Sequence, residues 1–372
     1  MSGANASARE AQARQRTART NARSHQKMQI AIAVAALVLS AQFALAQVDD
    51  TIEIVHVRGP VYLIAGGGCN ITISVGPDGS LLVDSGVAQM SDKVLASIRQ
   101  LLRQLTTAEA SLKYGSENRS ELQALRATPP PPKPIRYILN TNLDSDHTRG
   151  NEKIAKAGRT IAGGNVGGDL TDVQDIATII SHENVVRRMS AIKPPLPSAA
   201  LPIETYFTNV YKLGSHFNGE GIQLIHMPNA HTDGDSIVWF RSSDVISTGD
   251  VFSTETYPII DVEQGGSING EINALNDILD LAFPEFRTEG GTMIVPGHGR
   301  IADSADVAYY RDMVTIIRDR IQGMIAKGMT LDQVKAAKPT LDYDTRYDDP
   351  SWTKDKFVTA VYQSLSVKKQ VQ

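Results

Sequence analysis

Four short polar clusters, each following directly after an apolar run, constrain the fold of this chain most strongly. The apolar runs at residues 135–139, 222–226, 244–247 and 293–295 have the length of β-strands. Loops at strand ends are where a rigid scaffold presents binding and catalytic side chains. We therefore expect a fold that gathers several strand ends at one place. The clusters cover residues 140–151, 226–235, 247–252 and 295–299.

The elements between these clusters alternate between strands and helices. Residues 51–83 hold four narrow β-rich runs, with a turn at Gly76-Pro77-Asp78-Gly79, and predict an antiparallel meander. Apolar side chains at helical spacing predict helices at residues 90–105 and 272–281, and another strand is expected at residues 236–240. Two comparable halves of this kind predict an α/β fold, a four-layer αββα sandwich.

Two further segments flank the predicted sandwich domain, which spans residues 47–304. Residues 103–134 are polar, without a clear period, and end in a proline tract that cannot continue a helix, so they predict an exposed insertion. Residues 305–372 predict a helical extension packed on the domain. Within it we expect helices at residues 307–327 and 357–365, and a capping box from Thr330 to Gln333 opens another.

The first 46 residues have the features of a secretory signal. A leader with six basic side chains precedes the apolar run at residues 30–39, and Ala44-Leu45-Ala46 offers a cleavage site before Gln47. The alternative is a membrane anchor, but a spanning helix needs about 20 apolar residues. Met28 is an alternative start. We therefore predict a periplasmic or secreted protein without stable membrane insertion after cleavage.

Charge and cysteine content narrow the classes of partner. The leader holds six of the 37 basic residues and one of the 41 acidic residues, so the mature chain keeps 31 and 40. This acidic balance argues against nucleic acid as a partner; the oligomeric state is left open. Cys69 is the single cysteine, so no internal disulfide forms. It is either a small buried residue or a lone ligand or nucleophile.

The polar clusters carry residue types that bind metals. Asp144, Asp146 and His147 lie in the first cluster, with Asn142, and the later clusters contribute further candidates at His231, Asp250 and His298. Each cluster alone is a weak signal, since a strand-end aspartate commonly makes turn hydrogen bonds and a single histidine is more often structural. Together, in this order and spacing, they predict a metal site.

The clusters resemble the signature of the metallo-β-lactamase superfamily, which runs His-x-His-x-Asp-His, then a distant His-Thr-x-Gly-Asp, an Asp after a strand, and a Gly-His. The likeness covers about residues 48–302 and includes the element Leu82-Val83-Asp84-Ser85-Gly86. This sequence departs from the signature at its first two histidines, where Asn142 and Asp144 stand.

The resemblance implies roles for the matching residues. One metal position would be held by Asp146, His147 and His298, with Asp250 as a fourth or bridging ligand. The other would keep His231, with Asp144 in place of an imidazole and Asn142 as a weak neutral ligand, or would stay empty. Zinc suits such ligands best, as one or two ions, and iron or manganese would also be accepted.

The resemblance also implies hydrolysis of a small molecule such as a β-lactam, a lactone or another ester-like compound. Metal-activated water would be the nucleophile, and Asp144, Asp146 and His231 are the candidate catalytic residues. One rival is a catalytically degenerate protein that keeps the fold for binding or structure, favoured by the two lost histidines. Another is redox chemistry at an iron pair, for which the first motif supplies few ligands.

The remaining candidates have structural interpretations. Asp84 and Asp235 are expected to orient loops, and His226 to pack on its strand or support a ligand through a hydrogen bond. Arg149 is either a solvated surface residue or a cation that binds an anionic substrate group. The other histidines, at positions 56, 182 and 216, show no pattern of their own.

Overall fold

The computed structural model describes residues 51–113, 134–160, 176–213, 216–284 and 290–366 of the 372-residue chain. Seven strands form the first sheet in chain order, antiparallel from β1 to β4 and parallel from β4 to β7. They are β1 (Glu53–Arg58), β2 (Val61–Ala65), β3 (Ile71–Gly76), β4 (Gly79–Val83), β5 (Ile135–Leu139), β6 (Thr178–His182) and β7 (Glu204–Tyr206).

The second sheet has five strands in the order β12-β11-β10-β9-β8. β11 and β12 are parallel, and the other pairs are antiparallel. Parallel pairing sets the ends of β11 and β12 side by side, which brings their polar clusters together. The strands are β8 (Val210–Lys212), β9 (Ile222–His226), β10 (Ser236–Phe240), β11 (Val245–Ser253) and β12 (Met293–His298).

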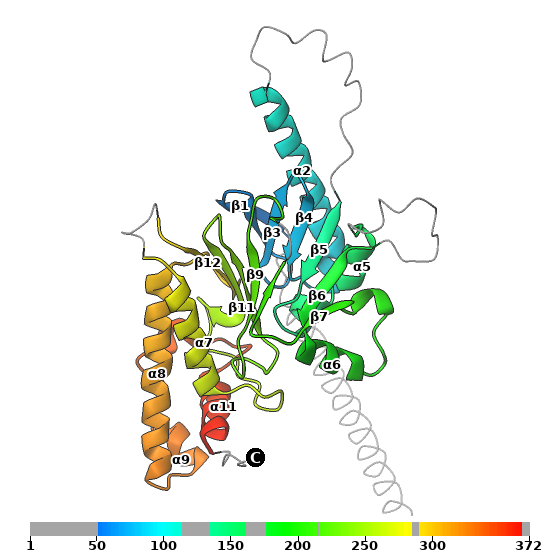
Figure 1. Cartoon of the computed structure of the whole chain (residues 1–372). Helices are drawn as coiled ribbons and strands as arrows, with labels where there is room; N and C mark the ends of the chain where they lie inside the picture. The colour runs from blue at the N-terminus through cyan, green and yellow to red at the C-terminus, as the bar shows by residue number, and fades with distance from the viewer. Residues whose placement is uncertain (1–50, 114–133, 161–175, 214–215, 285–289, 367–372) are drawn as a thin grey trace, which may run out of the picture. The chain divides into compact units, whose positions relative to one another are not determined.

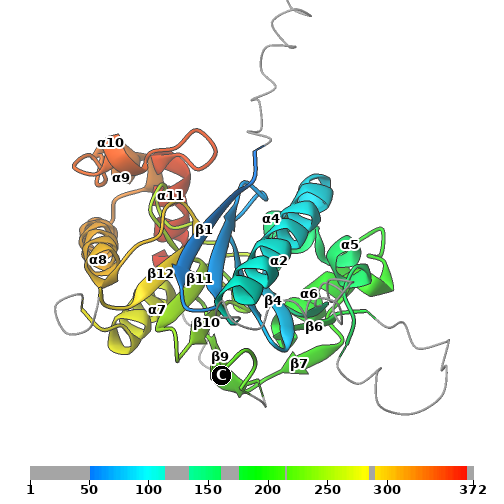
Figure 2. The same ribbon diagram turned by 90° about the horizontal axis from the view of Figure 1, so that it is seen from above.

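Helices cover the outer face of each sheet (Figures 1 and 2). On the side of the first sheet are η1 (Ala88–Met90), α2 (Ser91–Lys113), α4 (Ser145–Thr148), α5 (Asn151–Lys156), α6 (Glu183–Ala191) and η3 (Ser198–Ala200). On the side of the second are α7 (Ile268–Leu281), α8 (Ser304–Ala326), α9 (Leu331–Ala336), α10 (Asp344–Tyr347) and α11 (Lys354–Ser366).

Three apolar cores separate the four layers. One, which includes Leu81 and Val238, draws on both sheets and lies between them. A second joins the first sheet to α2 through residues such as Ile73 and Val94, and the largest joins the second sheet to α7, α8 and α11. All five residues of β4 are buried, as expected for a strand with packed layers on both faces. The predicted αββα sandwich is therefore confirmed.

The helices predicted from apolar spacing are present with shifted ends. α2 continues to Lys113, eight residues beyond the predicted end, because residues 106–113 contain good helix formers and no glycine or proline. The prediction that an exposed insertion begins at residue 103 was therefore wrong at its start. The proline tract lies outside the described residues.

Several short elements were not predicted. β6, β7, β8 and α6 have three to nine residues each, too few for a clear period, and β6 has polar Ser181 and His182 in buried positions. The three strands among them are held in place by hydrogen bonding to neighbouring strands of their sheets.

The C-terminal helices pack on the second sheet's helical layer. Thr330 and Gln333 form the predicted capping box at the start of α9. Phe357 of α11 is fully buried and stacks on Tyr257, with ring centroids 4.8 Å apart. Among the described residues, no helix is long and apolar enough to cross a membrane. The predicted signal, residues 1–46, lies outside the described residues.

Candidate metal centre

The six predicted ligands meet at one end of the two sheets. Asp144, Asp146 and His147 lie at the start of α4, just beyond β5, and His231 follows β9. Asp250 lies within β11 and His298 ends β12. Their side-chain donor atoms form two groups, each with its atoms within 4.8 Å of one another.

The first group consists of Asp146, His147 and His298. His298 Nε2 lies 3.1 Å from Asp146 Oδ2, and the two imidazole rings meet edge to face with centroids 5.7 Å apart. His147 is fully buried, whereas Asp146 and His298 are each about one-third exposed. Two imidazoles and one carboxylate on one side of a solvent-accessible point are a ligand set that zinc and iron accept.

The second group consists of Asp144, His231 and Asp250, and Asp250 also contacts the first group. Both Asp250 oxygens lie 3.1 Å from His147 Nε2, and Oδ1 is 3.5 Å from His298 Nε2. His231 Nε2 is 3.3 Å from Asp144 Oδ2. The Asp250 carboxylate therefore lies between the two groups, where a bridging ligand would be.

Asn142 supports the ligands through hydrogen bonds at both polar atoms of its side chain. Its Nδ2 donates to Asp250 Oδ2 at 2.9 Å, and its Oδ1 accepts from the Asp144 backbone N–H at 2.9 Å. The side chain is buried, so both polar atoms need these partners. In this geometry the amide holds one carboxylate and shapes the turn before another, and the role of Asn142 as a weak neutral ligand stays a prediction.

Two glycines allow the strands to approach closely enough for this arrangement. Gly249 has φ of +52°, and a Cβ there would lie 2.5 Å from Thr141 Oγ1. A Cβ on Gly297 would lie 2.5 Å from Asp250 Oδ1. Both distances are far shorter than van der Waals contact, so glycine is needed at each position for Asp250 to keep its place.

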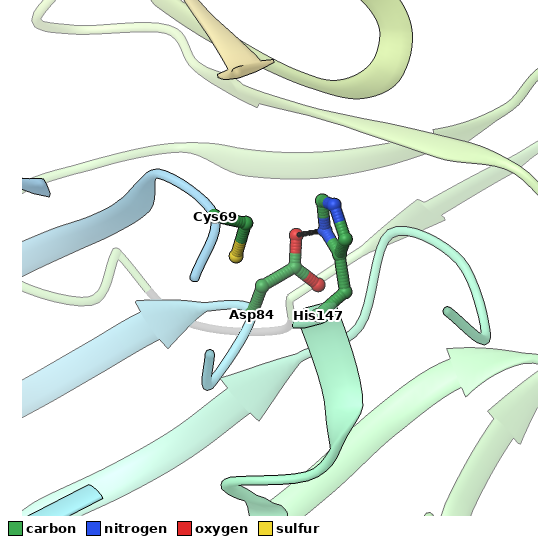
Figure 3. Close-up of side chains that lie close together, drawn as sticks. All are labelled: Cys69, Asp84 and His147. Carbon is green, nitrogen blue, oxygen red and sulfur yellow. Dashed lines mark hydrogen bonds and ion pairs between the residues drawn. The ribbon is translucent and has the colours of Figure 1, made fainter. Parts of the chain in front are cut away.

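Asp84 fixes the orientation of His147 (Figure 3). Its Oδ2 accepts from His147 Nδ1 at 2.8 Å and from Thr141 Oγ1 at 2.7 Å, and its Oδ1 accepts from the Thr141 backbone N–H at 2.9 Å. Asp84 has φ of +64°, a conformation rare for residues other than glycine. A carboxylate on Nδ1 leaves Nε2 facing the candidate ion, the usual arrangement behind a metal-bound histidine.

Cys69 lies beside this pair, and the three side chains come together as Figure 3 shows. The thiol is buried in the core beneath α2. Burial raises its pKa to about 11, although His147 nearby lowers it. Cys69 is thus a protonated thiol at neutral pH, which matches the interpretation as a small buried residue.

His231 provides a test of whether the site suits a metal. Its Nδ1 donates to the Ile259 carbonyl at 2.7 Å, which aims Nε2 at Asp144 and Asp250. Nε2 is buried and, within the described residues, has no partner in hydrogen-bond geometry. A buried polar atom without a partner is costly, and a metal ion would satisfy it. The donors present therefore fit a divalent ion.

The charges at the centre are strongly coupled. Burial would raise the pKa of Asp250, but His147, His298 and His231 hold it well below its ordinary value. Burial would lower the pKa of His147, but the carboxylates of Asp250 and Asp84 hold it well above its ordinary value. The pKa of His231 is also raised, against its burial, mainly by Asp144. A divalent cation would take the place of the protons on these imidazoles.

Asp235 has the loop-orienting role predicted for it. Its carboxylate accepts from the Thr232 backbone N–H at 2.6 Å and from Thr232 Oγ1 at 3.0 Å, which closes the turn after His231. Burial raises its pKa to about 7. His226 Nε2 donates to the Asp233 carbonyl at 2.9 Å, and its ring stacks on His182 with centroids 3.7 Å apart.

Glu271, a fully buried carboxyl in the first turn of α7, could not be identified from the sequence. Burial and the nearby Asp235 raise its pKa well above the ordinary value. Neither oxygen has a hydrogen-bond partner among the described residues. Its position on an otherwise amphipathic helix looks like an ordinary surface glutamate.

Three further side chains lie away from the ligands: those of Arg149, His56 and His216. The Arg149 side chain is exposed at the end of α4 and makes no hydrogen bond or ion pair within the described part of the chain, which matches the solvated alternative. His56 contacts the Gly59 carbonyl, and His216 is exposed.

A cleft of about 510 Å³ opens beside the second ligand group. Asp144 and His231 line one part of it, and the loop at residues 259–263 lines another. The remaining wall comes from α9, α11 and Trp352. A molecule of drug-like size would fit next to the candidate metal centre.

Comparisons with known proteins agree with this architecture. The sequence profile of the metallo-beta-lactamase superfamily matches residues 64–298. No curated protein sequence matches the chain. The fold is similar to that of the stereoselective inverting sec-alkylsulfatase Pisa1 from Pseudomonas sp., at 15% identity and a TM-score of 0.57 over 84% of this chain. This chain spans 50% of that protein's length.

Two metallo-beta-lactamases are also similar in fold. DIM-1 is 15% identical, with a TM-score of 0.46 over 71% of this chain and 97% of its own. The enzyme from Pontibacter korlensis is 12% identical, with a TM-score of 0.43 over 71% of this chain and 99% of its own.

Proposed function

Because this chain belongs to the metallo-β-lactamase superfamily, we propose that it is an exported, metal-dependent hydrolase of a small ester-like molecule such as a β-lactam or a lactone. One observation carries this proposal: two groups of ligand atoms meet at Asp250, which contacts His147 and His298, and the second group lines an open cleft. The family itself consists mostly of hydrolases, and the ligands are the residues by which this chain keeps the family's pattern.

The residues divide into holders of the metal and residues that act on water. Asp146, His147, His298 and Asp250 would hold one ion. A bound divalent ion lowers the pKa of water toward about 7 and polarises a carbonyl oxygen. Asp144, about one-third exposed at the cleft, is placed to accept a proton from the attacking water, and His231 to orient it or to help hold a second ion. Zinc is the proposed metal, with iron or manganese as alternatives.

The location proposed for this activity depends on the leader at residues 1–46. Cleavage after Ala46 would release the protein to the periplasm or the medium. A substrate there would be a small molecule of the envelope or the surroundings, in agreement with a cleft that takes one small ligand.

The test combines metal content with hydrolysis. The full-length chain is purified, its zinc, iron and manganese are measured by elemental analysis, and a panel of esters, lactones and β-lactams is assayed. We expect about one or two equivalents of metal and turnover of one panel class. The double variant Asp146→Ala/His298→Ala should lose both. No metal after addition of each ion would contradict the proposal.

A second function is favoured by the geometry of Asn142. Its amide is engaged with Asp250 and Asp144, so the second position has fewer ligands than the family signature provides. A catalytically degenerate protein that binds a small molecule is the corresponding alternative. Metal content near one equivalent with no hydrolysis of any panel member, before and after Asn142→His/Asp144→His, would favour it.

A further inference from the structure

We propose that the cleft is selective for an anionic molecule with a flat apolar part, with Lys335 of α9 as the residue that binds the anion and Trp352 as the platform for the apolar part. This inference rests on the proposed function only in taking the cleft as the substrate site. It adds a specificity determinant from the C-terminal helices, beyond the residues 64–298 that match the family.

The wall that carries Lys335 is firmly held. The capping box fixes the first turn of α9, and Val334 next to Lys335 is fully buried in the largest core. On α11, Phe357 and Val361 are buried in the same core. Both helices therefore face the cleft from defined positions, so their side chains can select a ligand.

Lys335 is a partly buried cation without a partner. Its side chain lines the cleft, yet within the described residues its ammonium makes no hydrogen bond or ion pair. By contrast, Lys354 is paired with two aspartates and Lys356 donates to the Ser351 carbonyl at 2.9 Å. A half-buried ammonium gains most from an anion that enters the cleft.

Trp352 is held so that its ring forms part of the cleft. Its Nε1 donates to the Pro258 carbonyl at 3.0 Å, and the Lys356 ammonium lies 6.0 Å from the ring centroid. Ile259, Ile260 and Val262 add apolar surface nearby. An indole fixed by its only polar atom presents an apolar face, suited to an aromatic ring or another flat group.

The acidic side chains that line the cleft have less influence on the charge of a bound ligand than Lys335 has. Asp261 accepts two hydrogen bonds from Gln264, at 2.9 and 2.7 Å, and so belongs to its own turn. Glu263 and Asp355 are exposed to solvent, which screens them. Asp144 is a candidate metal ligand whose charge an ion would offset. The half-buried cation is thus the group best placed to choose the charge of a ligand.

The test measures binding directly and does not depend on turnover. In a Trp239→Phe background, Trp352 is the single tryptophan of the full-length chain, so its fluorescence reports on the cleft. Three probes share one phenyl group and differ in charge: 4-phenylbutyrate, 4-phenylbutyramide and 4-phenylbutylamine. Each is titrated into zinc-loaded and chelator-treated protein, with Lys335→Met as the test variant and Lys327→Met, an exposed lysine outside the cleft, as the matched control.

We expect the carboxylate to bind about tenfold more tightly than the amide, and the amine most weakly. Lys335→Met should abolish the preference, and Lys327→Met should keep it. Equal affinity for all three probes, tighter binding of the amine, or a carboxylate preference that survives Lys335→Met would overturn the proposal. The last result would place the carboxylate on the metal. Failure of hydrolysis in the separate panel assay would count against the proposed function alone.

Discussion

Replacement of Asp84 by asparagine should weaken metal binding without unfolding the protein. The Asp84 carboxylate accepts three hydrogen bonds, from His147 Nδ1, Thr141 Oγ1 and the Thr141 backbone N–H. An asparagine has the same size but only one accepting oxygen, so its NH₂ group must face at least one of these donors. The imidazole then loses the carboxylate that orients it toward the ion.

The magnitude follows from these contacts. Removal of a residue that supports a metal-bound histidine typically costs 10–100-fold in metal affinity. That range corresponds to about 1.4–2.8 kcal/mol, close to the roughly 1.5–3 kcal/mol of one hydrogen bond to a charged group. We therefore expect the zinc dissociation constant of Asp84→Asn to rise by about 10–100-fold.

The assay is competition for zinc with a chromophoric chelator, accompanied by thermal unfolding of the metal-free protein. Asp303→Ala is the control, because the Asp303 carboxylate caps the N-terminus of α8, where it accepts from the backbone N–H groups of Ala305 and Asp306, and its loss should cost about 1 kcal/mol of stability. That control should keep wild-type zinc affinity. A folded Asp84→Asn protein with wild-type zinc affinity would refute the orienting role of Asp84.

Two further predictions concern pH and the C-terminal helices. Burial and the neighbouring His226 lower the pKa of His182 to about 4, so the unfolded chain takes up this proton first as the pH falls below about 6.5. As the pH falls from 6.5 to 4, this histidine should therefore cost about 1–3 kcal/mol of stability. Urea unfolding should show that the free energy of unfolding depends less on pH in His182→Asn than in the wild type. Asparagine keeps a side-chain cap for α6. Phe357→Ala should lower the free energy of unfolding by about 3–5 kcal/mol, because it empties a fully buried site against Tyr257. Elemental analysis should find the metal content of Phe357→Ala unchanged at temperatures where the variant stays folded, since no ligand comes from α11. A loss of metal would contradict the separation of the C-terminal core from the metal centre.

The sandwich and the ligand loops were predictable because their signals are local. Each ligand lies within or shortly after a strand that begins as an apolar run, and β9 to β12 of the second sheet stand out as such runs in the sequence. β6 to β8 lacked that signal, since strands of three to five residues depend on their neighbours for pairing. Helix α2 extends past its predicted end because residues 106–113 have no apolar period from which a helix could be predicted.

The contacts between side chains could not be predicted in the same way. The hydrogen bonds of Asn142 join residues 108 positions apart, and only the folded chain shows that its amide meets Asp250. Glu271 and Lys335 look like ordinary charged residues on amphipathic helices. Their burial and surroundings come from how the helices pack, which the sequence does not express locally.

The sharing of Asp250 between the two ligand groups has a consequence for how metal would load. One ion bound by Asp146, His147 and His298 would draw the Asp250 carboxylate toward itself and neutralise part of its charge. The remaining donors, His231 and Asp144, would then attract a second ion less strongly than the first. Titration with metal should consequently give two unequal steps, and the half-loaded protein would be a populated species over a wide range of metal concentration.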